Sequence, residues 1–357
     1  MCSVDIVENQ ADALGQDAEQ SCAIQFRATG SEYFGIWIVN LLLTIITFGI
    51  YSAWAKVRRN KYFYSSTEVA GSSFEYHGNP IAILKGRIIA FVLFGAYNVT
   101  IKYAPIAGLF MGLLLWAVLP WLIWKSMQFK LYNTSYRGIR FGFNGSAGQA
   151  YLYWLVFPLL AGITLSLLGP LAHQRLKRFQ HSQSRFGTTM FSFNGTVGAF
   201  YLAYLILIAI LVGGGIAFAI ALAVLGGVSL LAGGATTPFV MIAGVLGIYA
   251  FMFTVFPIFF SMIQNLIWNN TQLGEHRFVS QLRWTRMTFI MLTNLLGVIF
   301  TLGLFIPFAH VRMMRYRLES TTLVVKGSMD GFVADTQKNI TAAGEGMVDL
   351  MDFDMSM

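Results

Sequence analysis

The sequence predicts an all-α integral membrane protein with about seven transmembrane helices, internal repeats and short β-hairpins in the loops between the spans. Hydrophobic residues make up 56% of the 357 residues and charged residues only 11%, whereas soluble proteins carry about 25% charged residues. Several apolar stretches have the length of a membrane span, and some of them repeat one another. The scarcity of charge excludes a soluble enzyme, a disordered chain and a nucleic-acid-binding domain.

Charge divides the chain into three expected parts. Acidic residues cluster in an N-terminal tail, residues 1–25, and in a C-terminal tail, residues 330–357. The membrane domain between them, residues 26–329, holds 23 of the 24 Lys and Arg residues. Because membrane surfaces are negatively charged, the lipid bilayer with its anionic headgroups is the expected partner of these cations. A site for an anionic ligand is the alternative, and nucleic acid is not an expected partner.

About 20 apolar residues are needed to cross the hydrocarbon core of a bilayer. Seven stretches are candidates, although Lys85, Arg87 and Lys102 stand at the ends of the second and must reach the interface. The second and third stretches, and likewise the fifth and sixth, are joined by short loops and predict helical hairpins. The seven stretches are Phe34–Trp54, Arg87–Ile101, Ala104–Trp124, Tyr151–Leu171, Val197–Gly226, Phe239–Ile263 and Met287–Ala309.

The first, fourth and seventh spans repeat one pattern. A shift of 254 residues aligns Thr47 and Arg58 of the first span with Thr301 and Arg312 of the seventh. A shift of 137 residues aligns the fourth span with the seventh and brings Arg175 to the same position. In each copy a Gly or Pro, which loosens a helix, precedes a short basic helical segment.

A pattern typical of a β-hairpin follows these segments. Two aromatic residues stand two positions apart, and therefore on one face of a strand, and a Gly follows them. The pattern occurs at Phe74–Gly78, Phe141–Gly145 and Phe191–Gly195, and partly at 26–30, 277–282 and 323–327. We expect the aromatic residues to combine hairpin packing with an interfacial belt. The alternative is a ligand-binding surface.

Seven spans place the loops on two sides of the membrane. The repeated module then faces opposite sides in the two halves of the chain, as in inverted-repeat transporters. The excess of Lys and Arg places the C-terminus in the cytoplasm. In the alternative, every module faces the cytoplasm and Phe34–Trp54 is re-entrant. We prefer seven spans, because 21 residues are too few to cross the bilayer twice.

Few residues suggest chemistry. The sequence contains no catalytic constellation, no metal-ligand spacing and no cofactor motif, so we expect neither an enzyme nor a bound metal or cofactor. Asn40 and Asn294 occupy equivalent positions inside spans. Buried Asn side chains usually form hydrogen bonds between helices, and contact with a substrate is the alternative. Arg58, Arg175 and Arg312 are candidate basic positions at the membrane interface.

The lack of carboxylates inside the spans disfavours two classes of function. Proton- and cation-coupled carriers use acidic residues at membrane depth, and general acid–base enzymes need titratable groups. Transport of an anionic or amphiphilic solute, or of a lipid, is therefore the favoured function. A non-catalytic membrane scaffold or envelope protein is the alternative, and a membrane enzyme is the least favoured. The sequence predicts neither the solute nor the oligomeric state.

One repeated segment resembles a known family. The segment Thr47–Arg59, with the sequence TFGIYSAWAKVRR, and the preceding Phe26–Gly30 resemble the YjgN-like family of bacterial inner-membrane proteins, a domain of unknown function. The resemblance covers about residues 24–330 and implies a multi-pass protein of the bacterial inner (cytoplasmic) membrane. It implies no activity, catalytic residue or cofactor. His173 and His310 stand where the first copy has Lys56.

Overall fold

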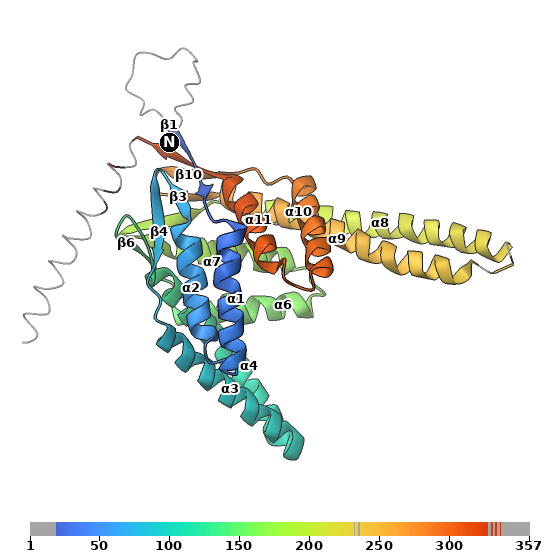
Figure 1. Ribbon diagram of the computed structural model, residues 1–357, viewed down its shortest axis with the longest axis horizontal. Coiled ribbons are helices and arrows are strands. Elements are labelled where there is room, and N and C mark those ends of the chain that lie inside the picture. The colour runs from blue at the N-terminus through green and yellow to red at the C-terminus, as the bar shows by residue number, and fades with distance from the viewer. Residues whose placement is uncertain are drawn as a thin grey trace, which may run out of the picture.

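The strands of the protein join into one closed ring. The computed structural model describes residues 19–231, 233–234, 236–327, 330, 333 and 336. Its antiparallel sheet has eleven strands in the order β1-β11-β10-β9-β8-β7-β6-β5-β4-β3-β2. Only Ile24 separates β1, which pairs with β11, from β2, which pairs with β3. This segment therefore connects both edges of the sheet and closes it into a barrel (Figure 1).

The strands are short and evenly distributed along the chain. They are β1 (Glu19–Ala23), β2 (Gln25–Phe26), β3 (Thr67–Val69), β4 (Ser72–Tyr76), β5 (Thr134–Tyr136), β6 (Ile139–Phe143), β7 (Ser184–Phe186), β8 (Thr189–Phe193), β9 (Thr271–Leu273), β10 (His276–Ser280) and β11 (Thr321–Lys326). The predicted β-hairpins thus exist, but they are not separate loop structures. They pair edge to edge with their neighbours, so the inner hairpins leave no strand edge unpaired.

One backbone hydrogen bond repeats five times around the barrel. At each junction, an N–H group just beyond one hairpin donates to the C=O group just before the next, over 2.8–2.9 Å. The donor–acceptor pairs are Arg27–Ser66, His77–Asn133, Asn144–Gln183, Asn194–Asn270 and Gln281–Ser320. The barrel therefore consists of five equivalent hairpins. The fifth is assembled from β11 and the β1–β2 segment, which come from opposite ends of the chain.

The helices that connect the hairpins leave the barrel at one end. Tight turns at residues 70–71, 137–138, 187–188 and 274–275 close four of the hairpins, and helices connect each hairpin to the next. Because neighbouring strands are antiparallel, the helical connections share one end, the helix-side end, and the turns share the other, the turn-side end. Two of the connections, α3–α4 and α8–α9, extend far beyond the rest (Figure 1).

The helices form five helical hairpins, two long and three short. They are α1 (Gly30–Ile46), α2 (Ser52–Ser65), α3 (Pro80–Tyr103), α4 (Pro105–Tyr132), α5 (Ala147–Tyr151), the π-helix η1 (Leu152–Val156), α6 (Phe157–Ile163), α7 (Gly169–Ser182), α8 (Val197–Leu231), α9 (Thr237–Asn269), α10 (Trp284–Phe300) and α11 (Ile306–Glu319). The long hairpins are α3–α4 and α8–α9. The short ones are α1–α2, α5–α7 and α10–α11.

The prediction of seven spans requires correction. Among the described residues, four helices are long and apolar enough to cross a membrane, namely α3, α4, α8 and α9. They contain the second, third, fifth and sixth predicted spans. The first, fourth and seventh predicted spans each fold back on themselves as a short helical hairpin. An apolar window has the same hydropathy whether the chain continues straight or reverses, so composition did not distinguish the two.

The reversals depend on residues in the left-handed backbone region. After α1, Phe48 and Gly49 adopt φ values of 49° and 90°. The same conformation recurs after α10 at Leu302 and Gly303, with φ values of 51° and 95°. Gly adopts such values without a steric penalty. The Thr47 hydroxyl fixes the first reversal, since it donates to the C=O four residues earlier at 2.7 Å and accepts the N–H four residues later at 2.9 Å.

The tips of the short hairpins are suited to lipid. Phe48, Leu165 and Leu302 are 98%, 90% and 95% exposed, and large apolar side chains in such positions favour contact with acyl chains over water. The 17-residue α1 is about 25 Å long, which is less than the roughly 30 Å of a hydrocarbon core. A helix of this length is too short to cross the hydrocarbon core.

The inverted arrangement of the repeats is also wrong. A single hydrogen-bonded barrel includes strands from every inter-span loop, and one barrel lies on one side of a membrane. Four crossing helices in two hairpins return the chain to that side each time. The repeated modules therefore all face the same side, which is the arrangement that the sequence disfavoured.

The core of the protein lies inside the barrel. Its buried side chains come from most of the hairpins and include Val69, Tyr136, Phe186, Leu273 and Leu323. Part of the predicted acidic N-terminal tail contributes as well, because β1 and the first residue of β2 fall within residues 1–25. The remainder of the two predicted tails lies outside the described residues, apart from positions 330, 333 and 336.

Candidate functional site: an aromatic barrel lumen beside a basic pocket

Four phenylalanines line the inside of the barrel at equivalent positions. Phe74, Phe141, Phe191 and Phe278 lie on the second strands of consecutive hairpins, each five residues before the N-cap of the next helix. Their ring centroids are 6.2, 6.5 and 6.4 Å apart in order around the barrel, within the range of favourable aromatic pairs. Ile24 occupies the fifth equivalent position. The predicted aromatic face of the hairpins is thus the wall of a lumen.

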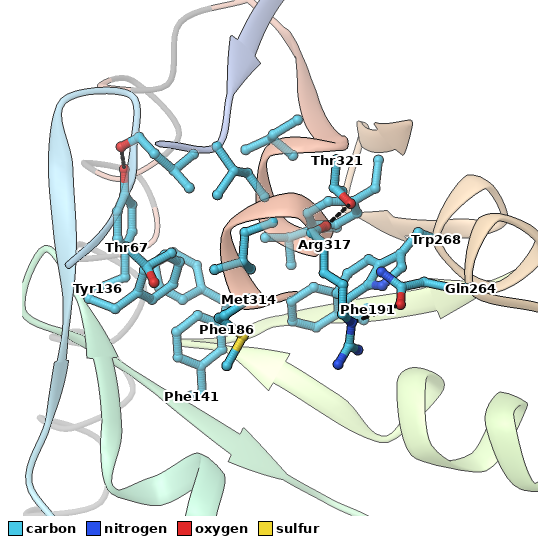
Figure 2. A pocket seen from close by; sticks show the side chains of 17 residues that line it. Thr67, Tyr136, Phe141, Phe186, Phe191, Gln264, Trp268, Met314, Arg317 and Thr321 are labelled. Carbon is cyan, nitrogen blue, oxygen red and sulfur yellow. Dashed lines mark hydrogen bonds between the residues drawn. The ribbon is translucent and has the colours of Figure 1, made fainter. Parts of the chain in front are cut away.

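The lumen contains a cavity of about 290 Å³. Helices α9 and α11 complete its wall at the helix-side end with Gln264, Trp268, Met314 and Arg317 (Figure 2). The remaining wall is apolar or aromatic apart from two threonines and the Tyr136 hydroxyl. The volume is close to the lower limit of about 300 Å³ for small-molecule sites in proteins.

Arg317 is the one cation in this wall. Its Nε donates to Oε1 of Gln264 at 3.1 Å, and its guanidinium carbon lies 5.0 Å from the centroid of the Phe260 ring. The burial of Arg317 at the barrel end of α11 lowers its pKa. Among the described residues, no carboxylate forms an ion pair with it. The cavity therefore offers a partly desolvated positive charge that no carboxylate of the described residues neutralises.

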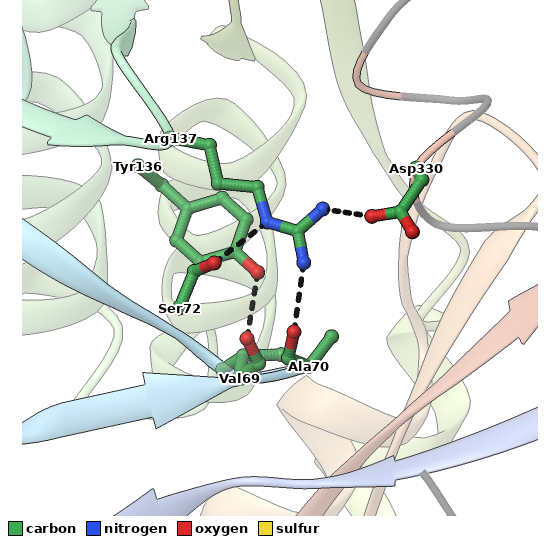
Figure 3. A network of polar contacts seen from close by, with 6 residues as sticks. All are labelled: Val69, Ala70, Ser72, Tyr136, Arg137 and Asp330. Carbon is green, nitrogen blue, oxygen red and sulfur yellow. Dashed lines mark hydrogen bonds and ion pairs between the residues drawn. The ribbon is translucent and has the colours of Figure 1, made fainter. Parts of the chain in front are cut away.

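Polar contacts join the first two hairpins at the turn-side end of the barrel. The Tyr136 hydroxyl crosses to the neighbouring hairpin and donates to the Val69 C=O at 2.7 Å. The adjacent Arg137 donates to the Ser72 hydroxyl at 2.9 Å and to the Ala70 C=O at 2.7 Å, and it pairs with the Asp330 carboxylate (Figure 3). The Tyr136 hydroxyl bond and the Arg137 side chain join the first two hairpins above the cavity.

A second chamber adjoins the lumen at that end. It has a volume of about 470 Å³ and shares Phe141, Phe191 and Trp268 with the wall of the first cavity. Lys130 of α4 and His181 of α7 supply its polar side chains together with Gln180 and Ser184. The two spaces together extend from the barrel interior to the helices.

His181 predicts a pH dependence of stability. Burial, with the nearby charge of Lys177, lowers the pKa of His181 to about 4, whereas an unfolded His has a pKa of about 6.5. Between these two pKa values the unfolded state then binds more protons than the folded state. The contribution of His181 to the free energy of unfolding is therefore fully present above pH 6.5 and is lost as the pH falls towards 4. This contribution is about 3 kcal/mol at most. We expect a flatter dependence of the melting temperature on pH for His181→Phe in detergent. An unchanged slope would contradict this assignment.

A separate basic pocket lies between α1, α2, α3 and α11. It has a volume of about 290 Å³, and Lys56, Arg59 and Arg87 line it. Lys56 and Arg59 stand three positions apart, on one face of α2, and Arg87 comes from the second turn of α3 and donates to the Ser52 hydroxyl. Arg59, Arg87 and also Lys130 are close enough to repel the charge of Lys56. No carboxylate belongs to the wall formed by described residues.

Asn40 brings an unpaired polar atom to this pocket. The side chain is buried, and its Oδ1 accepts no hydrogen bond from a described residue. An unsatisfied buried acceptor costs about 1–3 kcal/mol. His310 lines the pocket as well, at the repeat position that corresponds to Lys56 in the first copy.

The other predicted site residues differ in burial and in hydrogen bonding. Asn294 is buried, donates to the Ala309 C=O at 3.2 Å and accepts from Nη1 of Arg312 at 2.9 Å. This pair joins α10 to α11, the interhelical role that the sequence favoured. Arg58 is exposed and Arg175 half-buried, and neither forms a hydrogen bond or ion pair with a described residue. Whether any of these five positions takes part in function stays a prediction.

Sequence reasoning missed the residues that form the two sites. Lys56 and Arg59 were visible as a basic pair on one helix face, but their convergence with Arg87 depends on the packing of α2 against α3. Arg317 was one of several cations in the last basic segment, and only its position beneath the barrel distinguishes it. No group of three His, Cys, Asp or Glu residues that could hold a metal occurs within the described ranges.

Comparisons with known proteins agree on a family of membrane proteins. The model of the family DUF898, described as a bacterial protein of unknown function, matches residues 21–350. The chain is 31% identical over 144 residues to the inner membrane protein YjgN of Salmonella typhimurium, which covers 40% of this chain and 36% of that protein. It is 35% identical over 143 residues to YjgN of Escherichia coli K12, covering 39% and 35%. The aligned regions thus span about a third of these relatives. No solved structure matches the chain.

Proposed function

We propose a lipid-handling function for this chain, which belongs to the DUF898 family of bacterial proteins and, like its relatives, is a multi-pass protein of the inner membrane. In this proposal the basic pocket binds the headgroup of an anionic phospholipid from the leaflet next to the barrel. The observation that carries the proposal is the convergence of Lys56, Arg59 and Arg87 in a pocket without a carboxylate. No catalytic step is part of it.

The distribution of charge supports a cytoplasmic barrel. Of the 24 Lys and Arg residues, Lys102 is at the far end of the α3–α4 hairpin and Lys338 is outside the described residues. The other 22 lie in the barrel, in the short helical hairpins or in the barrel-side ends of long helices. Since Lys and Arg are retained on the cytoplasmic side, the barrel belongs in the cytoplasm, facing a leaflet that is rich in anionic lipid.

The position of the pocket supports a lipid rather than a soluble anion. The reversal between α1 and α2 ends in the fully exposed Phe48, so the helices that form the pocket are also in contact with acyl chains. Each Lys or Arg near an anionic surface contributes about 1 kcal/mol of attraction. A headgroup ammonium or hydroxyl would also supply the missing donor for Asn40.

Two double variants of α2 test the proposal. Lys56→Gln with Arg59→Gln removes two charges from the pocket, whereas Arg58→Gln with Lys61→Gln removes two exposed charges from the same helix. We expect the first pair to weaken binding of phosphatidylglycerol by about 2 kcal/mol, roughly 30-fold, and the second to have little effect. Binding is measured by native mass spectrometry or by lipid titration of purified protein, with phosphatidylcholine as the neutral reference.

Two results would contradict a headgroup site. Equal losses in both double variants would indicate general attraction to a negative surface. An equal affinity of the native protein for phosphatidylglycerol and phosphatidylcholine would remove the reason for a lipid-handling role. The non-catalytic membrane scaffold would then become the preferred function.

A further inference from the structure

We infer that the barrel lumen binds the single acyl chain of an anionic amphiphile, with Arg317 as the partner of its head group. The inference rests on the proposed lipid function for the origin of the ligand, but it concerns a second site with different residues. The occupant would be a fatty acid carboxylate or a lysophospholipid, which share one chain and one negatively charged head.

The wall of the lumen fits an acyl chain. The cavity is surrounded by the four phenylalanines that line the barrel, Phe74, Phe141, Phe191 and Phe278. Trp268 extends this aromatic wall towards the helices, and the centroid of its ring system lies 5.2 Å from that of Phe278. A polar solute would lose its hydration here without hydrogen bonds in return. An alkyl chain gains about 0.8 kcal/mol for each methylene that it buries.

The charge of Arg317 indicates where the charged head group of the ligand binds. A half-buried guanidinium without a carboxylate partner is costly to desolvate, and Gln264 satisfies only one of its donors. A carboxylate or phosphate can accept two parallel hydrogen bonds from a guanidinium. Figure 2 shows the guanidinium of Arg317 beside Gln264, with the aromatic residues of the lumen next to it. A head group bound there would leave its chain directed into the lumen.

The volume limits the length of the chain. A methylene group occupies about as much space as a water molecule, ~30 Å³, so a cavity of about 290 Å³ accepts roughly ten carbons. A phospholipid with two long chains does not fit. The adjoining chamber that contains Lys130 shares Phe141, Phe191 and Trp268 with the wall of the lumen, and in this inference the ligand enters through that chamber.

Equilibrium binding of dodecanoic acid to the full-length protein in phosphatidylcholine nanodiscs tests this site. We expect one dodecanoate per protein. Arg317→Gln is expected to weaken binding by roughly tenfold to a hundredfold, the range for charge-assisted hydrogen bonds. Arg178→Gln, which removes an exposed charge from α7, should bind like the native protein. Met314→Trp, which fills the cavity from α11, should reduce binding while Arg317 is retained.

The outcomes separate this site from the headgroup pocket. Phosphatidylglycerol binding should persist in Arg317→Gln, and dodecanoate binding should persist in the Lys56→Gln, Arg59→Gln variant. Lysophosphatidylglycerol of the same chain length forms the second arm. Binding of either ligand that depends on both Arg317 and the cavity supports the inference and identifies the source of the head group. Failure of both ligands to bind, or binding that is indifferent to Arg317→Gln and to Met314→Trp, overturns it.

Discussion

Cysteines at Ser65 and Thr188 are expected to react from the same side of the membrane, and a cysteine at Lys102 from the opposite side. Ser65 and Thr188 are exposed residues at two different hairpins of the barrel, and one barrel cannot lie on both sides. Lys102 is exposed near the tip of the α3–α4 hairpin, beyond a helix long enough to cross. In intact cells each cysteine should be labelled either fully or not at all, because a membrane-impermeant thiol reagent does not cross the inner membrane.

The experiment starts from a variant in which Cys2 and Cys22 are replaced by Ala. Intact cells with a permeabilised outer membrane are treated with the reagent, and lysed cells give the total number of reactive thiols. We expect labelling in intact cells only for the Lys102→Cys variant. Seven spans would place Thr188 on the same side as Lys102 and opposite Ser65. Labelling of Thr188→Cys without labelling of Ser65→Cys in intact cells would therefore contradict the closed barrel.

Phe186→Ala is expected to destabilise the protein by about 3–5 kcal/mol, the usual range for removing a buried phenyl ring. Phe186 is 1% exposed and contacts the rings of Phe141 at 5.0 Å and Tyr136 at 6.1 Å. Its loss enlarges the cavity in the centre of the barrel, where strands from distant parts of the chain meet. Because these strands also fix the helices, we expect the whole protein to become less stable.

The matched control is Phe48→Ala. Phe48 is the same residue type, but it lies fully exposed at the tip of the α1–α2 hairpin. In detergent its truncation should change the midpoint of thermal unfolding little, whereas Phe186→Ala should lower it by several degrees or prevent purification of folded protein. Similar midpoints for the two variants would show that the barrel interior is not the core of the fold.

The repeats were the strongest signal in the sequence, and the structure explains their residues. Thr47 and Thr301 recur because each fixes a reversal of the chain, and Gly49 and Gly303 recur because the reversal needs a positive φ. These residues indicated a repeated structural motif, but they did not reveal that the motif reverses the direction of the chain. A Gly near the end of an apolar stretch is equally compatible with a helix that loosens at the interface.

The alternating aromatic residues predicted the hairpins correctly because side-chain alternation is a local property of a strand. The pairing of those hairpins is not local. Whether Phe74 and Phe141 face lipid, water or one another depends on which strand edges meet, and edge pairing was absent from every motif. The location of the cavity, and the difference between Arg317 and the other cations of the same segment, follow from that pairing.

By itself, the sequence determined that this is a multi-pass membrane protein, that it is built from repeated modules and that each module ends in short strands. Composition and local spacing are sufficient for these properties, because each depends on residues that are close in the chain, whereas the bacterial inner membrane was implied by the family resemblance. The tertiary structure alone decided that four helices rather than seven are long enough to cross, that all modules share one side and that five hairpins close around an apolar lumen. These properties depend on contacts between distant segments, above all between β1 and β11, which join the two ends of the chain.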